Sequence, residues 1–171
     1  MIQMRLTDLS NILNVKEINS SQTFKGISVN SRDTMPSNLF VAIKGTRFDG
    51  HDYVKEAADK GAIAAVVERF NPKLSILQLV VSDTLKALGD LASVWRAKFK
   101  VPVIGITGSV GKTTVKEMIG SILSQLGSCL TSQGNMNNEI GLPLTLFSIQ
   151  KDTDFVVVEM GAAKNGDIDY L

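Results

Sequence analysis

The sequence has very few of the residues on which several common site chemistries depend. Among its 171 residues there is one cysteine, Cys129, and one histidine, His51. A single cysteine cannot form an internal disulfide, and no nearby residue would activate its thiol, so we expect Cys129 to be inert. A single histidine also excludes a histidine-rich metal cluster.

Long apolar runs and an excess of one charge are absent as well. No apolar run approaches the roughly 18 residues that span a bilayer, and the N-terminal residues MIQMRLTDL lack the basic-then-apolar pattern of a signal peptide. The net charge is +1, with no stripe of lysines and arginines. These absences argue against membrane insertion and against a nucleic-acid partner. We therefore expect a cytoplasmic protein, and a monomer.

Residues 1–83 alternate short apolar runs with a helical pattern, which is typical of a small α/β domain. Residues 39–43, 62–67 and 77–81 are predicted strands. Residues 51–60 have helical spacing, and Gly61 is placed to end the helix.

A bridging helix is predicted over residues 84–100, capped by Asp83 or Thr84 and ended by Pro102. Its apolar side chains share one stripe: Leu85, Leu88, Leu91, Ala92, Trp95 and Phe99. Core packing explains this stripe better than stacking on nucleic-acid bases does.

The second domain, residues 101–171, begins with a predicted strand at 101–107 and contains another at 154–159. A further helix is predicted at 140–149, with Pro143 in its first turn. Between them, apolar residues at helical spacing predict one buried helix face: Val115, Met118, Ile119, Ile122, Leu123 and Leu126. Only two strands are evident here, so we expect the domain to continue beyond Leu171.

A glycine-rich segment joins the first of these strands to the following helix. Residues 105–114 read GITGSVGKTT, here called the phosphate loop. Glycines let the backbone curl so that several N–H groups converge on phosphate oxygens, and the helix N-terminus adds its positive dipole end. Lys112 can reach the β- and γ-phosphates of ATP, and the Thr113 hydroxyl can bind Mg²⁺.

A tight glycine turn with a solvated Lys112 is the alternative interpretation. The usual pattern G-x-x-x-x-G-K-[ST] places a glycine at position 106, whereas this loop has Ile106 there and spaces its glycines as G-x-x-G-x-x-G-K-T-T. A phosphate site is still favoured, because strand, glycines, lysine, threonines and helix all occupy the required places.

Glu159 ends a buried strand, where ligands gather in α/β sheets. Its carboxylate is a candidate for holding Mg²⁺, directly or through water. A solvent-facing acid at a strand end would be the better interpretation if the phosphate loop were absent.

Three segments of the second domain together resemble the Mur ligases of peptidoglycan precursor synthesis. TGSVGKTTVKE at 107–117 is similar to their ATP loop, GNMNNEIGLP at 134–143 to a second motif, and EMGA at 159–162 with GDI at 166–168 to a third. Segments SR at 31–32, LFVAIKG at 39–45 and DGH at 49–51 resemble the family's N-terminal UDP-sugar domain. The second and third motifs are closest to the branch that adds D-Ala-D-Ala.

The resemblance implies a fold: a small N-terminal α/β UDP-sugar-binding domain followed by the first part of a P-loop ATPase-type α/β domain. It also implies a reaction, in which ATP and Mg²⁺ activate the carboxylate of a UDP-N-acetylmuramoyl tripeptide as an acyl phosphate that D-Ala-D-Ala then attacks. Lys112 and Glu159 would be catalytic, and Thr113 and Glu159 would hold the metal. By position, the ATP-binding residues would be Gly108, Ser109, Val110, Gly111, Lys112, Thr113, Thr114 and Asn138. Those for the UDP-substrate would be Ser31, Arg32, Lys44, Gly45, Asp49, Gly50 and His51.

Without the resemblance, Arg32 would be read as a surface ion pair with Asp33 or another acid. Two other functions also stay open. One is a sibling ligase that adds a different amino acid, and the other is a nucleotide-binding module without ligase chemistry. In either ligase case the 171 residues alone are expected to be inactive, because such enzymes are much longer.

Overall fold

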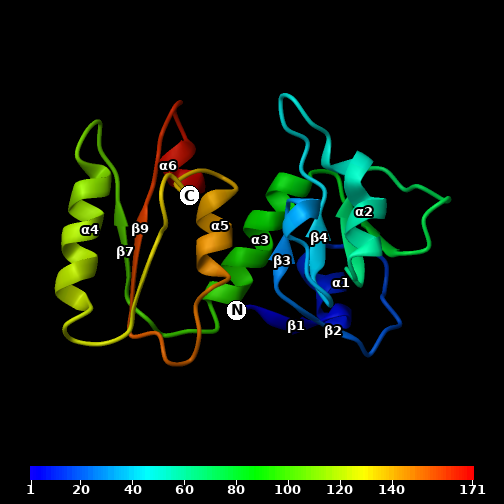
Figure 1. Ribbon diagram of the computed structural model, residues 1–171, viewed down its shortest axis with the longest axis horizontal. Coiled ribbons are helices and arrows are strands. Elements are labelled where there is room, and N and C mark those ends of the chain that lie inside the picture. The colour runs from blue at the N-terminus through cyan, green and yellow to red at the C-terminus, as the bar shows by residue number, and fades with distance from the viewer. The chain divides into compact units, whose positions relative to one another are not determined.

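The computed structural model describes residues 1–171 and divides into two compact units, Met1–Leu91 and Ala92–Leu171 (Figure 1). The division falls within α3 (Thr84–Arg96), inside the segment that we expected to bridge two domains. Every helix is too short or too polar to cross a bilayer.

The first unit contains a four-stranded parallel sheet in the order β3-β4-β5-β6 and a separate antiparallel pair, β1-β2. Phe40, Ala65 and Val67 form its core with helix side chains such as Val54 and Ala57. The strands are β1 (Gln3–Arg5), β2 (Thr23–Lys25), β3 (Ile27–Ser28), β4 (Leu39–Val41), β5 (Ala64–Val67) and β6 (Leu77–Val80). The helices are η1 (Leu6–Asp8), α1 (Leu9–Ile12), η2 (Ser31–Asp33), η3 (Gly50–Tyr53) and α2 (Val54–Asp59).

The second unit is a three-stranded parallel sheet in the order β7-β9-β8, with α4 and α5 on opposite faces (Figure 1). Its core lies between β9 and α5, where Val156 and Val158 meet Leu142 and Leu146. The elements are β7 (Val103–Ile106), α4 (Lys112–Leu123), β8 (Cys129–Thr131), α5 (Gly141–Leu146), β9 (Phe155–Glu159) and α6 (Asp167–Tyr170).

The α/β class is confirmed, and each strand predicted from an apolar run is present within a few residues of its expected bounds. Asp83 caps α3 as predicted, because its Oδ1 accepts from the Lys86 N–H at 2.9 Å. Gly61 ends the helical segment with φ +95°. Strand β8 was not predicted, and it makes the second sheet three-stranded rather than two-stranded.

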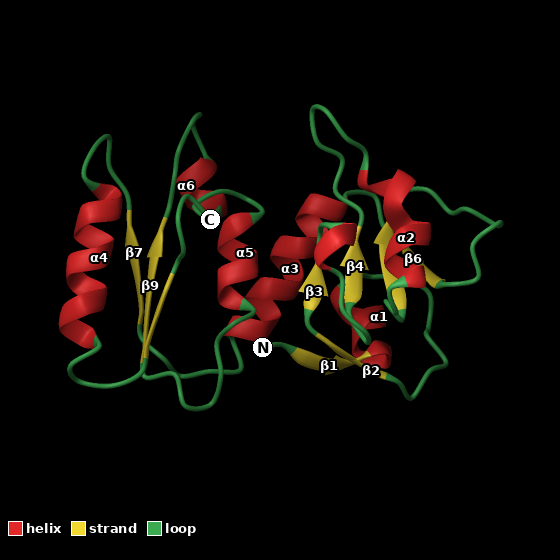
Figure 2. Cartoon of the chain, viewed as in Figure 1, coloured by secondary structure: helices red, strands yellow, loops and turns green.

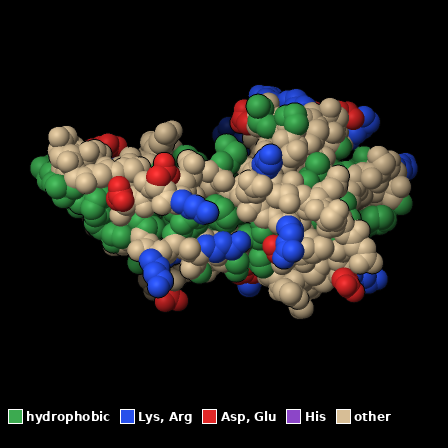
Figure 3. All heavy atoms as spheres, turned by 90° about the horizontal axis from the view of Figure 1, so that it is seen from below, with side chains coloured by type: hydrophobic (Ala, Val, Ile, Leu, Met, Phe, Trp, Pro, Cys, Tyr) green, Lys and Arg blue, Asp and Glu red, His purple; other side chains and the backbone are tan.

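The predicted buried face of α4 is wrong for four of its six residues. Val115, Met118, Ile122 and Leu126 are exposed, at 43%, 61%, 63% and 73%. The helix instead turns Lys116 and Gly120 toward β8 and β9. A Cβ at Gly120 would lie 2.6 Å from Thr131 Cγ2, so only a glycine allows this close approach. Figure 3 shows hydrophobic side chains gathered at the end of the molecule where α4 lies.

Candidate functional site

The phosphate loop follows β7 and leads into α4, and both β7 and β9 point toward this edge of the sheet (Figure 2). Gly108 and Gly111 have φ of +151° and +77°, which only glycine adopts without strain. A Cβ at Gly105 would overlap Met160 Cε, so a larger residue here would displace the flexible end of that methionine. The loop is therefore curled rather than extended.

The Lys112 side chain folds back over the phosphate loop. Its Nζ donates to the Gly108 carbonyl at 2.7 Å, so the ammonium lies over the loop that should receive the phosphates. The first amides of α4 have no partner within the helix, and the helix dipole is positive at this end. The loop thus combines a cation with free N–H donors, the requirements of an anion site.

The Glu159 carboxylate meets the phosphate loop at the end of β9. Thr113 Oγ1 donates to Glu159 Oε2 at 2.7 Å, and Asn137 Nδ2 donates to Oε1 at 2.8 Å. Glu159 is only 3% exposed. Burial alone would raise the pKa of this carboxyl, but the hydrogen bonds from Thr113 and Asn137, with the charges of Lys116 and Lys112, lower it below its usual value.

The two asparagines of the second motif have different contacts. Asn138, the residue expected near the nucleotide, is exposed, and its Oδ1 accepts from the Ile140 and Gly141 N–H groups at the start of α5. Asn137 contacts Glu159 instead, and its carbonyl accepts from the Gly161 N–H at 2.7 Å. Sequence reasoning missed this role, because two adjacent asparagines give no sign of which one points inward.

Ser132 and Lys116 were also missed. Both are buried, and Ser132 Oγ accepts from the Glu159 N–H at 3.0 Å while its carbonyl accepts from Lys116 Nζ at 2.6 Å. A helical lysine and a serine beside an unpredicted strand carry no recognisable signal in the sequence.

Cys129 lies in β8 and is half-buried. Burial raises the pKa of its thiol, which lowers the thiolate fraction and agrees with an inert role.

A cavity of about 280 Å³ opens in the first unit beside Ser31 and Arg32. Phe48, Gly50 and Tyr53 also line it. Of the seven residues predicted for the UDP-substrate, the structure thus brings Ser31, Arg32 and Gly50 together.

Arg32 forms no ion pair with Asp33, whose carboxylate accepts from Asn30 Nδ2 at 2.7 Å. The acid near Arg32 is Glu56, whose pKa is lowered by hydrogen bonds from Lys60 and Ser31 and also by the charges of Lys60 and Arg32. Lys44 and Gly45 lie on an exposed loop, whose ends meet in an isolated bridge between Lys44 and Asp49.

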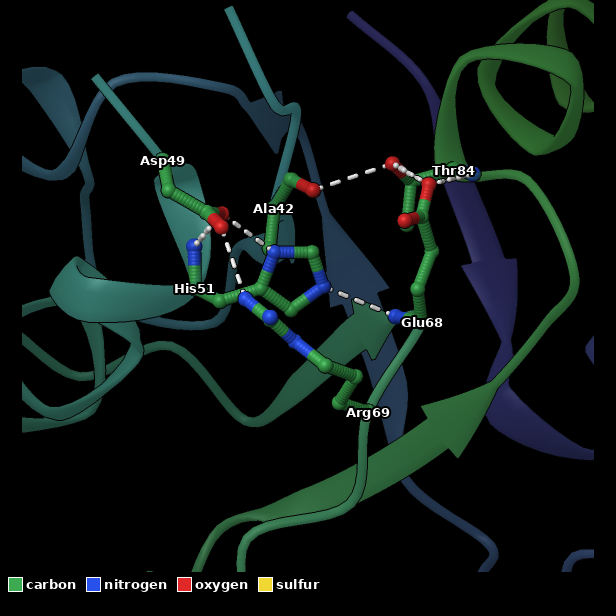
Figure 4. Close-up of polar contacts among 6 residues, drawn as sticks. All are labelled: Ala42, Asp49, His51, Glu68, Arg69 and Thr84. Atoms are coloured by element: carbon green, nitrogen blue, oxygen red, sulfur yellow. Dashed lines mark hydrogen bonds and ion pairs between the residues drawn. The ribbon is translucent and has the colours of Figure 1, made fainter.

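Asp49 and His51 are engaged with one another rather than with the cavity (Figure 4). His51 Nδ1 lies 2.6 Å from Asp49 Oδ1, and His51 Nε2 accepts from the Glu68 N–H at 2.8 Å. The imidazole therefore carries its proton on Nδ1, and this N–H donates a hydrogen bond to Asp49 Oδ1. Arg69 binds the other oxygen of Asp49 at 2.7 Å.

The bonds to Asp49 lower its pKa to about 2. The His51 backbone N–H and ring hydrogen bonds are the main causes, and the charge of Arg69 adds to them. The pair fixes the turn that places Gly50 at the cavity.

Comparison with known proteins gives one consistent result. A sequence profile of the Mur ligase family catalytic domain matches residues 23–96, and the profile of the Mur ligase middle domain matches residues 106–171. Among curated relatives, the UDP-N-acetylmuramoyl-tripeptide–D-alanyl-D-alanine ligases of Escherichia coli and Synechocystis are 42% and 41% identical to the chain. The alignments cover 98% and 94% of the chain.

Solved structures agree with the sequence matches. The crystal structure of MurF from Acinetobacter baumannii superposes with a TM-score of 0.91 at 38% identity, over 99% of this chain and 38% of that one. The MurF ligase of Thermotoga maritima in complex with ADP gives 0.79 at 38% identity, over 85% and 34%. The chain spans 37% of the Escherichia coli relative and 36% of the Synechocystis one. Because both of its units match Mur ligase domains in sequence and in fold, the chain belongs to the Mur ligase family.

Proposed function

We propose that the chain provides the UDP-sugar-binding and ATP-binding parts of a ligase that joins D-Ala-D-Ala to a UDP-N-acetylmuramoyl tripeptide. The observation that carries the proposal is the meeting of Lys112, Thr113 and Glu159 at a curled phosphate loop. Relatives named for this reaction, about 40% identical over nearly the whole chain, support the choice of substrates. In domain terms, residues 1–83 bind the UDP-sugar, 84–100 form the bridging segment that contains α3, and 101–171 bind ATP.

The oxygen atoms at the loop fit a magnesium ion. A hydroxyl and an ionised carboxylate lie side by side in Thr113 and Glu159, and both are the hard oxygen ligands that Mg²⁺ prefers. No group of three or more histidine, cysteine, aspartate or glutamate side chains could hold a metal by itself. Two protein ligands are enough for Mg²⁺, which keeps several waters and binds substrate phosphates.

Each residue has a distinct task in this proposal. Lys112 exchanges its bond to the Gly108 carbonyl for phosphate oxygens and offsets their charge during transfer. The loop amides from Gly108 to Thr114 orient the phosphates. Asn137 and Thr113 keep Glu159 ionised and aligned, and Asn138 secures α5 beside the loop. When bound, Mg²⁺ would neutralise charge on the phosphates.

The first unit holds the other substrate. The Arg32 guanidinium has a planar set of donors that matches two oxygens of a diphosphate, and Ser31 adds a hydroxyl. The cavity they line is bordered by the rings of Phe48 and Tyr53, which provide apolar contact area.

A ligase of this kind uses ATP and a UDP-linked precursor, so we place it in the cytoplasm as a monomer. Both proposed sites are built from one chain. The relatives extend well beyond the aligned region, and we expect the 171 residues alone to bind these ligands without completing the reaction.

Titration of the chain with UDP-N-acetylmuramoyl tripeptide tests the substrate assignment. Losing a charged bidentate contact costs about 1.5–3 kcal/mol, so Arg32→Ala should weaken binding by roughly 10- to 100-fold. Lys25→Ala, an exposed lysine on β2 that is absent from the cavity lining, should bind as the unsubstituted chain does. Equal affinities of the chain and of Arg32→Ala would contradict the assignment.

A nucleotide-binding module without ligase chemistry is the competing function, and the same titration separates it. Such a module would bind nucleotide but not the UDP-linked tripeptide.

A further inference from the structure

Lys116 is a buried charge for which the proposed chemistry gives no direct use. It is 0% exposed, on the side of α4 that faces β8 and β9. Lysines are almost never fully buried, since removing an ammonium from water costs several kcal/mol unless it is well paired. Its Nζ donates to the Ser132 carbonyl at 2.6 Å and lies 2.9 Å from Glu117 Oε1.

Ser132 links this ammonium to the backbone of Glu159, the residue whose carboxylate is proposed to bind the metal. It is 1% exposed, its Oγ accepts from the Glu159 N–H at 3.0 Å, and its own N–H donates to the Val157 carbonyl at 3.1 Å. Ser132 therefore has two contacts: its carbonyl accepts from Lys116 Nζ, and its Oγ accepts from the backbone N–H of Glu159. The linkage runs from α4 through the end of β8 to the end of β9.

We propose that Lys116 is a positioning residue that sets the place of the Glu159 carboxylate through Ser132. It would thereby control the affinity of the loop for a divalent cation bound with nucleotide, without touching either ligand. The inference rests on the proposed function, because it requires that nucleotide and Mg²⁺ bind at the phosphate loop.

Because Lys116 is charged, the direction in which Mg²⁺ affinity changes when the charge is removed tests the positioning role. A nearby ammonium repels a divalent cation, so if charge alone mattered, removing it would strengthen Mg²⁺ binding. If Lys116 positions Glu159, removing it weakens Mg²⁺ binding, because a misplaced carboxylate is a poorer ligand. Loss of a residue that orients a metal ligand typically costs 10- to 100-fold in metal affinity.

The test compares the chain with Lys116→Met, which keeps the length of the side chain without its charge. The Kd for ADP is measured by calorimetry in EDTA and in excess Mg²⁺, and the ratio of the two values gives the enhancement by the metal. We expect Lys116→Met to lower this ratio about tenfold while the Kd in EDTA is unchanged. A role confined to fold stability would shift both Kd values together. Lys151→Met, an exposed lysine in a turn of the same unit, is the matched control.

Three results would overturn the inference or its basis. An unchanged or raised ratio in Lys116→Met contradicts the inference alone. A chain that binds no ADP, or binds it without help from Mg²⁺, contradicts the proposed function and the inference with it.

If Lys116→Met shows no cooperative thermal transition, Ser132→Ala replaces it, since it removes the acceptor for the Glu159 N–H and keeps the carbonyl that Lys116 binds. An unchanged ratio in Ser132→Ala would also contradict the inference.

Discussion

At the Glu159 carboxylate, burial and hydrogen bonding act in opposite directions. Burial penalises the charged form, while donors from Thr113 and Asn137 stabilise it at distances of 2.7 and 2.8 Å. The hydrogen bonds and nearby lysines prevail, so the carboxylate is ionised before any ligand arrives. An ionised, aligned oxygen pair is what a magnesium site requires.

The Asp49–His51 pair makes stability depend on pH. The pKa of Asp49 falls from 3.8 to about 2 in the folded chain, so its contribution is complete above about pH 4 and is lost as the pH falls toward 2. Allowing for solvent screening, this amounts to roughly 1–2 kcal/mol. Asp49→Asn should therefore reduce the change in the free energy of unfolding between pH 5 and pH 2.5, measured by urea denaturation.

Asp152→Asn, at an exposed turn, controls for the general effect of removing a carboxylate. If Asp49→Asn had the same pH dependence as this control, the Asp49–His51 contact would not stabilise the fold.

For individual residues, the sequence is a good guide to the segments that form a site, and a poorer guide to the side chains that reach into it. Glycine spacing and a following lysine have one strong structural meaning, so the curled backbone of residues 105–114 could be predicted. The contact of Asn137 with Glu159 was not predicted, and Asn138, expected near the nucleotide, bonds to the start of α5 instead. These contacts, and the turning of Asp49 and His51 toward Glu68 and Arg69, depend on backbone directions that no local pattern encodes.

Among the elements, α4 departs most from expectation. Its apolar spacing predicts a buried stripe, but the three-stranded sheet contacts the side that carries Lys116 and Gly120. Periodicity shows that a helix has an apolar face, whereas what covers that face depends on the sheet available to it.

The exposed face of α4 gives a prediction about stability. Ile122 is 63% exposed, so Ile122→Lys should change the free energy of unfolding of the chain by no more than about 0.5 kcal/mol. Leu142→Ala in α5, which empties a buried position, should cost about 2–5 kcal/mol. Chemical denaturation of the two variants measures both, and a large loss in Ile122→Lys would contradict the described packing of α4.

In addition to the Asp83 cap, a buried hydroxyl holds the start of α3 (Figure 4). Thr84 is 1% exposed, and its Oγ1 lies 3.0 Å from the Ala42 carbonyl and 3.2 Å from Glu68 Oε1. Thr84→Val keeps the shape but leaves the Ala42 carbonyl without this donor, which should cost about 1–3 kcal/mol of unfolding free energy.

Ser93→Ala, at an exposed position of α3, should be near neutral in the same denaturation measurement. Equal stability of Thr84→Val and Ser93→Ala would show that the hydroxyl does not hold the helix.

Strand β8 shows why some elements escape sequence-based prediction. It has three half-buried residues, Cys129–Thr131, too few for a visible period of two. It forms because β9 offers its free edge, a long-range reason absent from the local sequence.

For the molecule as a whole, the proposed function divides between the two units. Arg32 and its cavity lie in the first unit, and the phosphate loop with Glu159 lies in the second. Arg32→Ala is therefore expected to affect only the UDP-linked ligand, and Lys112→Ala only the nucleotide.

Calorimetric titration of the chain with ATP and Mg²⁺ tests the central claim most directly. The account predicts saturable binding that Lys112→Ala weakens by about 10- to 100-fold, because a charge-assisted bond to phosphate is lost, while Lys151→Ala leaves it unchanged. Absence of binding, or equal binding by the chain and Lys112→Ala, would contradict the assignment of a phosphate site to residues 105–114.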